Sequence, residues 1–258
     1  MFQKQALSDT ELIEMLKRYP FLLVLATTCA LSACSLGRTP VPGNAYLESL
    51  GIRARQASDL AAISELQRWS QQHLVTAQRE LGLSLARTED KYPDAVFWLL
   101  EAARQGDAEA QFQIAEAFFH ARLGLQKQST QAYRWYQAAA AQNDHKAALM
   151  LARMAKYGDG TVASTASSLQ WLRRAADLGN AQAMFLLSNA YEHGEGVNAD
   201  PALAREWLEK AADGEYPPAV HQLALLLETD QKPEERERAR LLRKEATDER
   251  HLRWKNYQ

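Results

Sequence analysis

Histidine and cysteine are the residues in this sequence with the widest range of chemistry, and their spacing favours neither catalysis nor metal binding. No histidine falls in a zinc-ligand spacing such as HExxH. No GxSxG element, P-loop or dinucleotide fingerprint occurs. The segment His193-Gly194-Glu195-Gly196 joins an imidazole to a carboxylate, but its glycines fit a turn. We therefore expect no catalytic residue, no metal ion and no cofactor. The six histidines are His73, His120, His145, His193, His221 and His251.

Cys34 is the side chain for which the sequence predicts a covalent modification. A basic pair, Lys17-Arg18, precedes an apolar run over residues 19–33 that is too short to cross a bilayer as a helix. This pattern is typical of an export signal. The four residues Leu31-Ser32-Ala33-Cys34 resemble the lipobox of bacterial lipoproteins. That resemblance implies cleavage before Cys34, diacylglycerol on its sulfur and acylation of its amino group.

The N-terminal segments follow from this resemblance. We expect a signal peptide over residues 1–33, with Met15 as an alternative start because acidic residues before it are unusual in an export signal. Residues 34–43, with their prolines, are expected to form a tether. Ser35 after the cysteine implies the outer membrane, facing the periplasm, and the inner membrane is the alternative. No cysteine remains for a disulfide or a zinc site, because Cys29 lies in the discarded segment.

Composition predicts an all-helical protein. Alanine occurs 44 times, whereas valine and isoleucine together occur 11 times. Alanine is the best helix former, and the two β-branched residues are strong strand formers. A formal charge of −2 provides no basic surface for nucleic acid, so we expect no nucleic-acid partner.

A repeat of tryptophan and alanine organises the rest of the chain. Successive tryptophans lie 37, 36 and 36 residues apart, and each is followed four and five places later by an alanine pair. A period in the 30s in a helical sequence indicates a solenoid of stacked helix pairs. Glycines between the first and second helix of two units favour left-handed turns. These repeat residues are Trp98, Trp135, Trp171, Trp207, Gly158, Gly160, Gly194 and Gly196.

These residues resemble the Sel1-like repeat, a relative of the tetratricopeptide repeat, over residues 75–246. The resemblance implies a right-handed α-solenoid of helix-turn-helix repeats that binds proteins on its concave face. It weakens at the ends, where Leu123-Gly124-Leu125 replaces a two-glycine turn and Leu242 takes the tryptophan position. We expect a helical cap over 44–74, in which Leu60, Ile63, Leu66 and Trp69 form one face, and a tail over 247–258.

Candidate partner-binding residues lie opposite the packing face of each first helix, at constant offsets from its leading alanine. An apolar column beside a polar one suits a groove for a peptide or protein segment. The alternative is that the aromatic members pack against the next first helix. The candidates are Phe112, Glu116, Phe119, Leu149, Arg153, Phe185, Asn189 and His221.

The sequence thus predicts a non-enzymatic periplasmic scaffold lipoprotein that binds envelope proteins or peptide segments. The comparison with repeat lipoproteins implies assembly of an envelope complex such as an alginate-like exopolysaccharide exporter. A periplasmic enzyme or regulator acting on peptidoglycan or β-lactams is the first alternative. A secreted, host-directed effector is the second, and it would require Cys34 to stay unacylated. The oligomeric state and the identity of the partner do not follow from the sequence.

Overall fold

The structure is a computed structural model that describes residues 40–57, 59–229 and 231–255. Signal peptide, Cys34 and most of the expected tether lie outside these residues. In the described part, every regular element is a helix, and the residues from Pro42 onward form one compact unit. The helices are α2 Asn44–Ala57, α3 Leu60–Gln71, α4 Val75–Leu85, the 3₁₀ turn η2 Glu89–Lys91, α5 Tyr92–Arg104, α6 Ala108–His120, α7 Ser129–Ala141, α8 His145–Tyr157, α9 Thr165–Asp177, α10 Ala181–His193, α11 Pro201–Asp213, α12 Pro217–Glu228 and α13 Pro233–Lys255.

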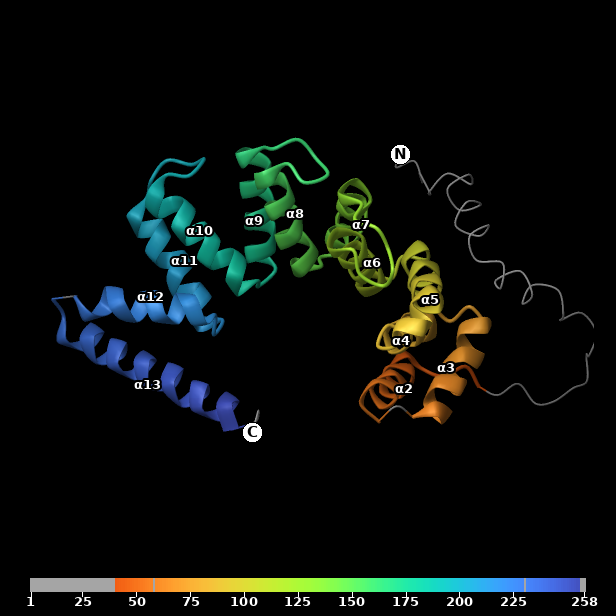
Figure 1. Ribbon diagram of the computed structural model, residues 1–258. Helices are drawn as coiled ribbons and strands as arrows, with labels where there is room; N and C mark the ends of the chain where they lie inside the picture. The colour runs from red at the N-terminus through yellow and green to blue at the C-terminus, as the bar shows by residue number, and fades with distance from the viewer. Residues whose placement is uncertain (1–39, 58, 230, 256–258) are drawn as a thin grey trace, which may run out of the picture. The chain divides into compact units, whose positions relative to one another are not determined.

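The helices pack in chain order as antiparallel pairs, as the tryptophan spacing predicts. Each of the pairs α4–α5, α6–α7, α8–α9, α10–α11 and α12–α13 is in extensive contact, and each second helix also contacts the first helix of the next pair (Figure 1). A helix pair cannot cover its own apolar faces, so stacking on both neighbours completes the core. No described helix is long and apolar enough to span a membrane.

Small residues allow this close stacking. The leading alanine of each first helix is fully buried, and so is the first alanine of each pair in the second helices α5, α7, α9 and α11. The four repeat tryptophans pack on the core with part of each ring exposed. Helices can approach closely where alanine faces alanine, and the indole fills the wider space beside them. The leading alanines are Ala110, Ala147, Ala183 and Ala219.

Repeated caps fix where the first helices begin. In α6, α8 and α10, the side chain three residues before the leading alanine accepts a hydrogen bond from that alanine's backbone N–H, which satisfies one of the open donors of the first turn. The three capping residues are Asp107, Asp144 and Asn180.

The glycine turns between first and second helices have the left-handed backbone that the sequence predicts. Gly158 and Gly160 have φ values of +76° and +71°. A Cβ on Gly160 would lie 2.3 Å from the carbonyl oxygen of Ser129, so only glycine fits there. In the preceding unit, Ala121 and Leu123 adopt the same left-handed conformation without glycine, at φ +54° and +55°.

The helical cap differs from its prediction at one residue. Helices α2 and α3 form it, with Leu66 and Trp69 buried and Ile63 partly buried. Leu60, however, is 78% exposed. It is the first residue of α3, directly after the capping Asp59, and at that position its side chain lies beyond the reach of α2 and α4.

The last pair closes the repeat array. Leu242 of α13, at the tryptophan position, packs beside the buried cluster of α11 and α12. Helix α13 continues past residue 246 to Lys255. The side chains of α13 that the structure describes, up to residue 244, are mostly exposed, which suits the mixed charges of this segment.

Candidate partner-binding pocket between α8 and α10

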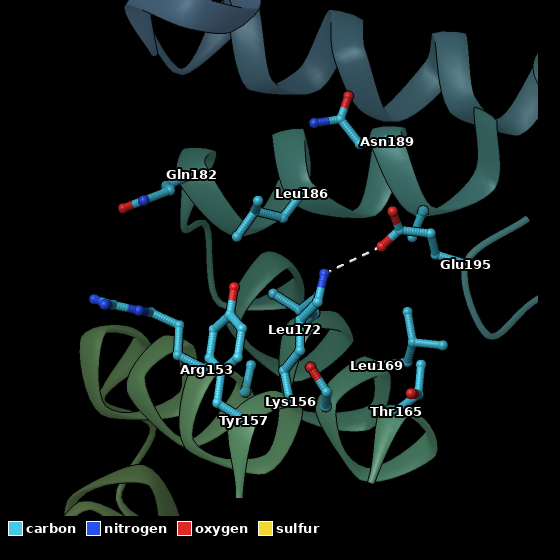
Figure 2. A pocket seen from close by; sticks show the side chains of 13 residues that line it. Arg153, Lys156, Tyr157, Thr165, Leu169, Leu172, Gln182, Leu186, Asn189 and Glu195 are labelled. Carbon is cyan, nitrogen blue, oxygen red and sulfur yellow. Dashed lines mark hydrogen bonds and ion pairs between the residues drawn. The ribbon is translucent and has the colours of Figure 1, made fainter. Parts of the chain in front are cut away.

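A pocket of about 350 Å³ lies between α8, α9 and α10 (Figure 2). Its floor is apolar and consists of Leu169 and Leu172 of α9 and Leu186 of α10, together with two alanines. Leu169 and Leu172 are only 7% and 8% exposed, so they belong to the core and present one side of each chain to the pocket. A preformed apolar floor with polar groups around it is the usual composition of a binding site.

Three residues of one turn of α8 form a basic rim. Arg153, Lys156 and Tyr157 stand at i, i+3 and i+4, so they share one face of the helix. All three are exposed, and Tyr157 is 70% exposed. The backbone of α8 ends at Gly158, whose left-handed conformation turns the chain away just after Tyr157.

The opposite rim is polar and partly acidic. It contains Gln182 and Asn189 of α10 and Glu195 from the two-glycine loop after that helix (Figure 2). Lys156 Nζ lies 3.1 Å from Glu195 Oε2, so this ion pair bridges the two rims at one end of the pocket. Both partners are more than half exposed, and a pair in that setting contributes at most about 1 kcal/mol.

Arg153 differs from Lys156 because it makes no ion pair with another described residue, although its charge is near enough to Tyr136 to act against the rise in the pKa of that tyrosine. The contact recorded for its side chain is a weak one, from Nη1 to the sulfur of Met150 at 3.7 Å. Among the described residues, no carboxylate lies within ion-pair distance of this guanidinium. Guanidinium groups bind carboxylates in strong, directional pairs, so Arg153 is an open site for an anion at the pocket rim.

The structure brings together two of the sequence-predicted residues and separates the others. Arg153 and Asn189 line the same pocket. Leu149 is a core residue at 8% exposure and offers almost no surface. His221 is exposed on α12, outside this pocket.

The aromatic candidates form contacts inside the repeat. Phe112 is partly buried, with its ring centroid 5.8 Å from that of Tyr136 on α7. Phe185 is also partly buried, 5.4 Å from Tyr216 at the start of α12. The contact of Phe185 is with the next first helix, as the alternative describes, whereas Phe112 packs on the second helix of its own pair.

Glu116 and Phe119 surround the same tyrosine on α7. The hydroxyl of Tyr136 donates a hydrogen bond of 2.6 Å to Glu116 Oε1, and the tyrosine is fully buried. Burial, together with this bond and the charge of Glu116, raises the pKa of Tyr136 far above its usual range. Glu116 is therefore engaged within its own repeat. Phe119 lies near the same ring, with the centroids 6.4 Å apart.

Several lining residues were not predicted. Tyr157, Gln182 and Leu186 fall outside the offsets used for the columns. Glu195 belongs to His193-Gly194-Glu195-Gly196, which the sequence identifies as a turn. The turn is present, and it also places the carboxylate of Glu195 at the pocket. The sequence feature that could have predicted this is the charged residue between the two glycines of the turn.

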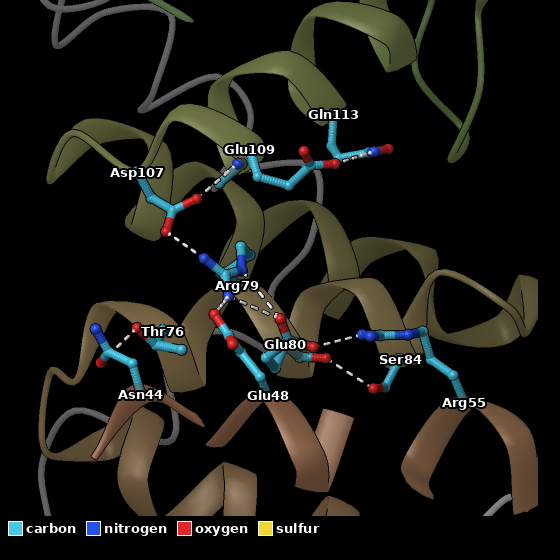
Figure 3. Close-up of polar contacts among 11 residues, drawn as sticks. Asn44, Glu48, Arg55, Thr76, Arg79, Glu80, Ser84, Asp107, Glu109 and Gln113 are labelled. Atoms are coloured by element: carbon cyan, nitrogen blue, oxygen red, sulfur yellow. Dashed lines mark hydrogen bonds and ion pairs between the residues drawn. The ribbon is translucent and has the colours of Figure 1, made fainter. Parts of the chain in front are cut away.

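A second charged cluster, centred on Arg79, joins the cap to the first repeats (Figure 3). Arg79 of α4 pairs with Glu48 of α2 at 2.9 Å, with the neighbouring Glu80 at 2.9 Å and with Asp107 before α6 at 3.0 Å. Burial opposes the charge of Arg79, but its three carboxylate partners outweigh this effect and raise its pKa. Every buried polar side-chain atom in the described residues has a hydrogen-bond partner.

Metal binding has no support in the described residues, since they contain no cluster of three His, Cys, Asp or Glu side chains that could hold an ion. The pocket itself contains one carboxylate, already paired with a lysine. Most of its polar side chains are exposed rather than gathered in an enclosed site. Such an arrangement suits recognition, in which a partner supplies the covering surface.

Stacked helix pairs with an open pocket between consecutive first helices define an α-solenoid repeat protein. The chain belongs to the Sel1 repeat family, whose model matches residues 77–107, 108–144, 145–180 and 181–216. Sel1 repeat proteins are in general non-catalytic scaffolds for protein–protein interaction, and this repeat is suited to that role. The family match confirms the predicted repeat over residues 77–216, and its first unit contains α4 and α5, which pack together.

Solved structures agree on the fold. A Sel1 repeat protein from Oxalobacter formigenes superposes with a TM-score of 0.68 at 23% identity, over 80% of this chain and 91% of that one. A protective antigen present in uropathogenic Escherichia coli strains, described as displaying an SLR fold, gives a TM-score of 0.54 at 20% identity. That match covers 80% of this chain and 54% of the antigen. A search of curated proteins finds no match.

Proposed function

We propose that this protein is a non-enzymatic scaffold of the bacterial cell envelope, anchored by acyl chains on Cys34 and binding other envelope proteins through its repeats. The observation that supports the binding role is the pocket between α8 and α10, where an apolar floor lies beside an arginine with no ion-pair partner in the described chain. The lipobox-like Leu31-Ser32-Ala33-Cys34 supports the anchor. Two or more acyl chains suffice for stable membrane attachment.

Within the envelope, the proposed place is the periplasmic face of the outer membrane, because serine follows the cysteine. The proposed task is to hold the components of an envelope complex together, for which an exopolysaccharide-secretion channel is the example suggested by related repeat lipoproteins. A scaffold needs several contact surfaces on a rigid frame, and stacked repeats provide one surface per unit. The enzyme alternative has no comparable support, since the polar side chains of the pocket are mostly exposed.

Metabolic labelling tests the anchor. Cells expressing the full chain with a C-terminal tag are grown with radiolabelled palmitate, and the tagged protein is captured from detergent-solubilised envelopes. We expect label on the wild-type chain and none on Cys34→Ser, which should appear in the soluble periplasmic fraction. Unlabelled wild-type protein would contradict the anchor and favour the secreted effector.

Capture of partners tests the scaffold role. Proteins that co-purify with the wild-type chain are identified by mass spectrometry, and each is then produced separately and used to capture the scaffold in return. We expect at least one envelope protein to co-purify with the scaffold and also to capture the scaffold in the reciprocal experiment. Failure of every reciprocal capture, with the chain properly anchored, would contradict the scaffold role. The enzyme alternative is tested in a deletion strain, by measuring growth in the presence of β-lactams and the rate of peptidoglycan turnover.

A further inference from the structure

The pocket between α8 and α10 carries a more specific assignment, which rests on the proposed binding function. We infer that it takes an extended peptide segment of a partner protein in which an acidic side chain lies two positions from an apolar one, and that Glu195 occupies part of the acidic site in the free protein. The acidic side chain pairs with Arg153, and the apolar side chain lies on the floor formed by Leu169, Leu172 and Leu186.

The charges of the pocket favour an acidic partner. Its lining contains two cationic side chains, Arg153 and Lys156, and one carboxylate, Glu195. Glu195 is paired with Lys156, which leaves one positive charge in excess at Arg153. Arg79, in contrast, has three carboxylate partners within the chain. A carboxylate from outside would supply the partner that Arg153 lacks.

The arrangement of the rim favours a segment that passes through the pocket over a chain end that stops in it. Lys156 and Tyr157 stand side by side one turn after Arg153 on α8, each about 5 to 6 Å from it along the helix surface. Figure 2 shows Lys156 and Tyr157 beside Leu172, with the guanidinium of Arg153 extending outward from the leucines and the polar residues of α10 opposite. The polar groups thus line an edge of the pocket and do not converge on one point, as capture of a terminal carboxylate would require.

The apolar floor sets the spacing within the segment. Alternate side chains of an extended peptide point to the same side, about 7 Å apart. Because both residues must point toward the protein, we place the residue directed at the floor and the residue directed at the basic rim two positions apart. Because the floor leucines present apolar surface of moderate size, an aliphatic side chain fits better than a charged one.

Glu195 and Arg153 are expected to have opposite effects on peptide binding, and both effects can be measured. The Glu195 carboxylate lies on Lys156, so an incoming acidic side chain competes with it for the basic rim. Removing the Glu195 charge should strengthen binding, whereas removing the Arg153 charge should weaken it. A pocket with only a structural role would show neither effect.

The experiment begins with a selection on the purified mature chain. A phage-displayed library of random dodecapeptides, flanked by phage protein on both sides, is selected against the wild type and counter-selected against Arg153→Gln. Enriched sequences are synthesised with acetylated N-termini and amidated C-termini, so that the only carboxylates are side chains. Binding is measured by fluorescence anisotropy at low and at high salt.

We expect enriched peptides to carry Asp or Glu two positions from an aliphatic residue. Arg153→Gln should weaken their binding about tenfold, since a charge-assisted pair is lost. Glu195→Gln should strengthen it about twofold to fivefold, because a competing surface ion pair is removed. Raising the salt concentration should weaken binding to the wild type more than binding to Arg153→Gln. Arg134→Gln, at an exposed arginine of α7 outside the pocket, is the matched control and should leave affinity unchanged.

The assignment is overturned if no peptide is enriched, if the enriched peptides lack the acidic residue, or if Arg153→Gln and Arg134→Gln behave alike. A requirement for a free peptide C-terminus would also overturn it in favour of terminal capture. The proposed scaffold role fails separately, in the reciprocal captures described above. If envelope partners bind Arg153→Gln and wild type equally, the scaffold role stands and this pocket is not their site.

Discussion

Two arginines of this protein, Arg79 and Arg153, stand in opposite environments. Arg79 is 15% exposed and has three carboxylate partners, from α2, from α4 and from the residue that caps α6. Arg153 is exposed beside an apolar pocket, and no described carboxylate pairs with it. The first arrangement holds three segments of the chain in one register. The second leaves a guanidinium without an ion pair among the described residues, and we propose that it serves recognition instead of stability.

Removing the Arg79 charge should produce the largest effect. Arg79→Met leaves Asp107, which is 10% exposed, without its cationic partner, and leaves Glu80, which is 5% exposed, with Arg55 as its remaining one. Uncompensated buried charge of this kind costs about 3 kcal/mol of unfolding free energy. Urea denaturation followed by circular dichroism measures it.

Arg134→Met is the control, because this exposed arginine of α7 should lose less than about 0.5 kcal/mol on substitution. If Arg79→Met lost no more than the control, the cluster would contribute nothing to stability and the contrast between the two arginines would be wrong.

An intermediate loss of unfolding free energy is expected when the neutral hydrogen-bond donor of Glu116 is removed. Tyr136→Phe removes the hydroxyl that donates to Glu116 while keeping the ring in the core. Glu116 is 18% exposed, so solvent replaces the bond only in part, and the loss should be about 1 kcal/mol. The same urea measurement applies. A loss as large as that of Arg79→Met would mean that neutral and charged partners are equally important for the carboxylates of this fold.

The outcome for Glu116 shows which part of the site could be predicted from the sequence. The repeat period predicts helix pairs and buried alanines, because burial follows from position along a regular helix. The partner-binding residues cannot be predicted in this way, because their exposure depends on which side chains of the neighbouring helices lie opposite them. Tyr136 on α7 engages Glu116, and Tyr216 covers Phe185, and neither contact is visible within one helix. Arg153 was predicted from its offset on α8, and it lines the pocket because no described carboxylate engages it.

The left-handed turns show the same limit in the backbone. Glycines at 158 and 160 predict their conformation, since a left-handed φ costs glycine little. Ala121 and Leu123 have the same conformation without that signal. There the packing of the helices on both sides imposes the turn, against the local preference of the residues.

Acidification should give a smaller effect, centred on Glu109. Burial raises the pKa of this carboxyl, but hydrogen bonds from Gln113 and Lys146 outweigh burial and hold it below the ordinary value of 4.5. A lowered pKa in the folded state means that the stabilisation is present above the unfolded pKa and is lost as the pH falls through the folded one. Unfolding free energies at about pH 6 and about pH 3 should therefore differ less in Glu109→Gln than in wild type. An identical difference in both would show that Glu109 contributes no pH dependence.

The smallest expected effect, and the sharpest test of the contrast, is the stability of Arg153→Met. Arg153 has no ion pair in the described chain to lose, and its side chain is exposed. Its substitution should change the unfolding free energy by less than about 0.5 kcal/mol, as at Arg134. Replacing a charged group by an apolar one beside the pocket could even stabilise the protein slightly, because the lone positive charge next to Lys156 is removed. A loss of about 2 kcal/mol or more in urea denaturation would show that the guanidinium has a structural partner, and Arg153 would then join Arg79 among the residues that hold the fold.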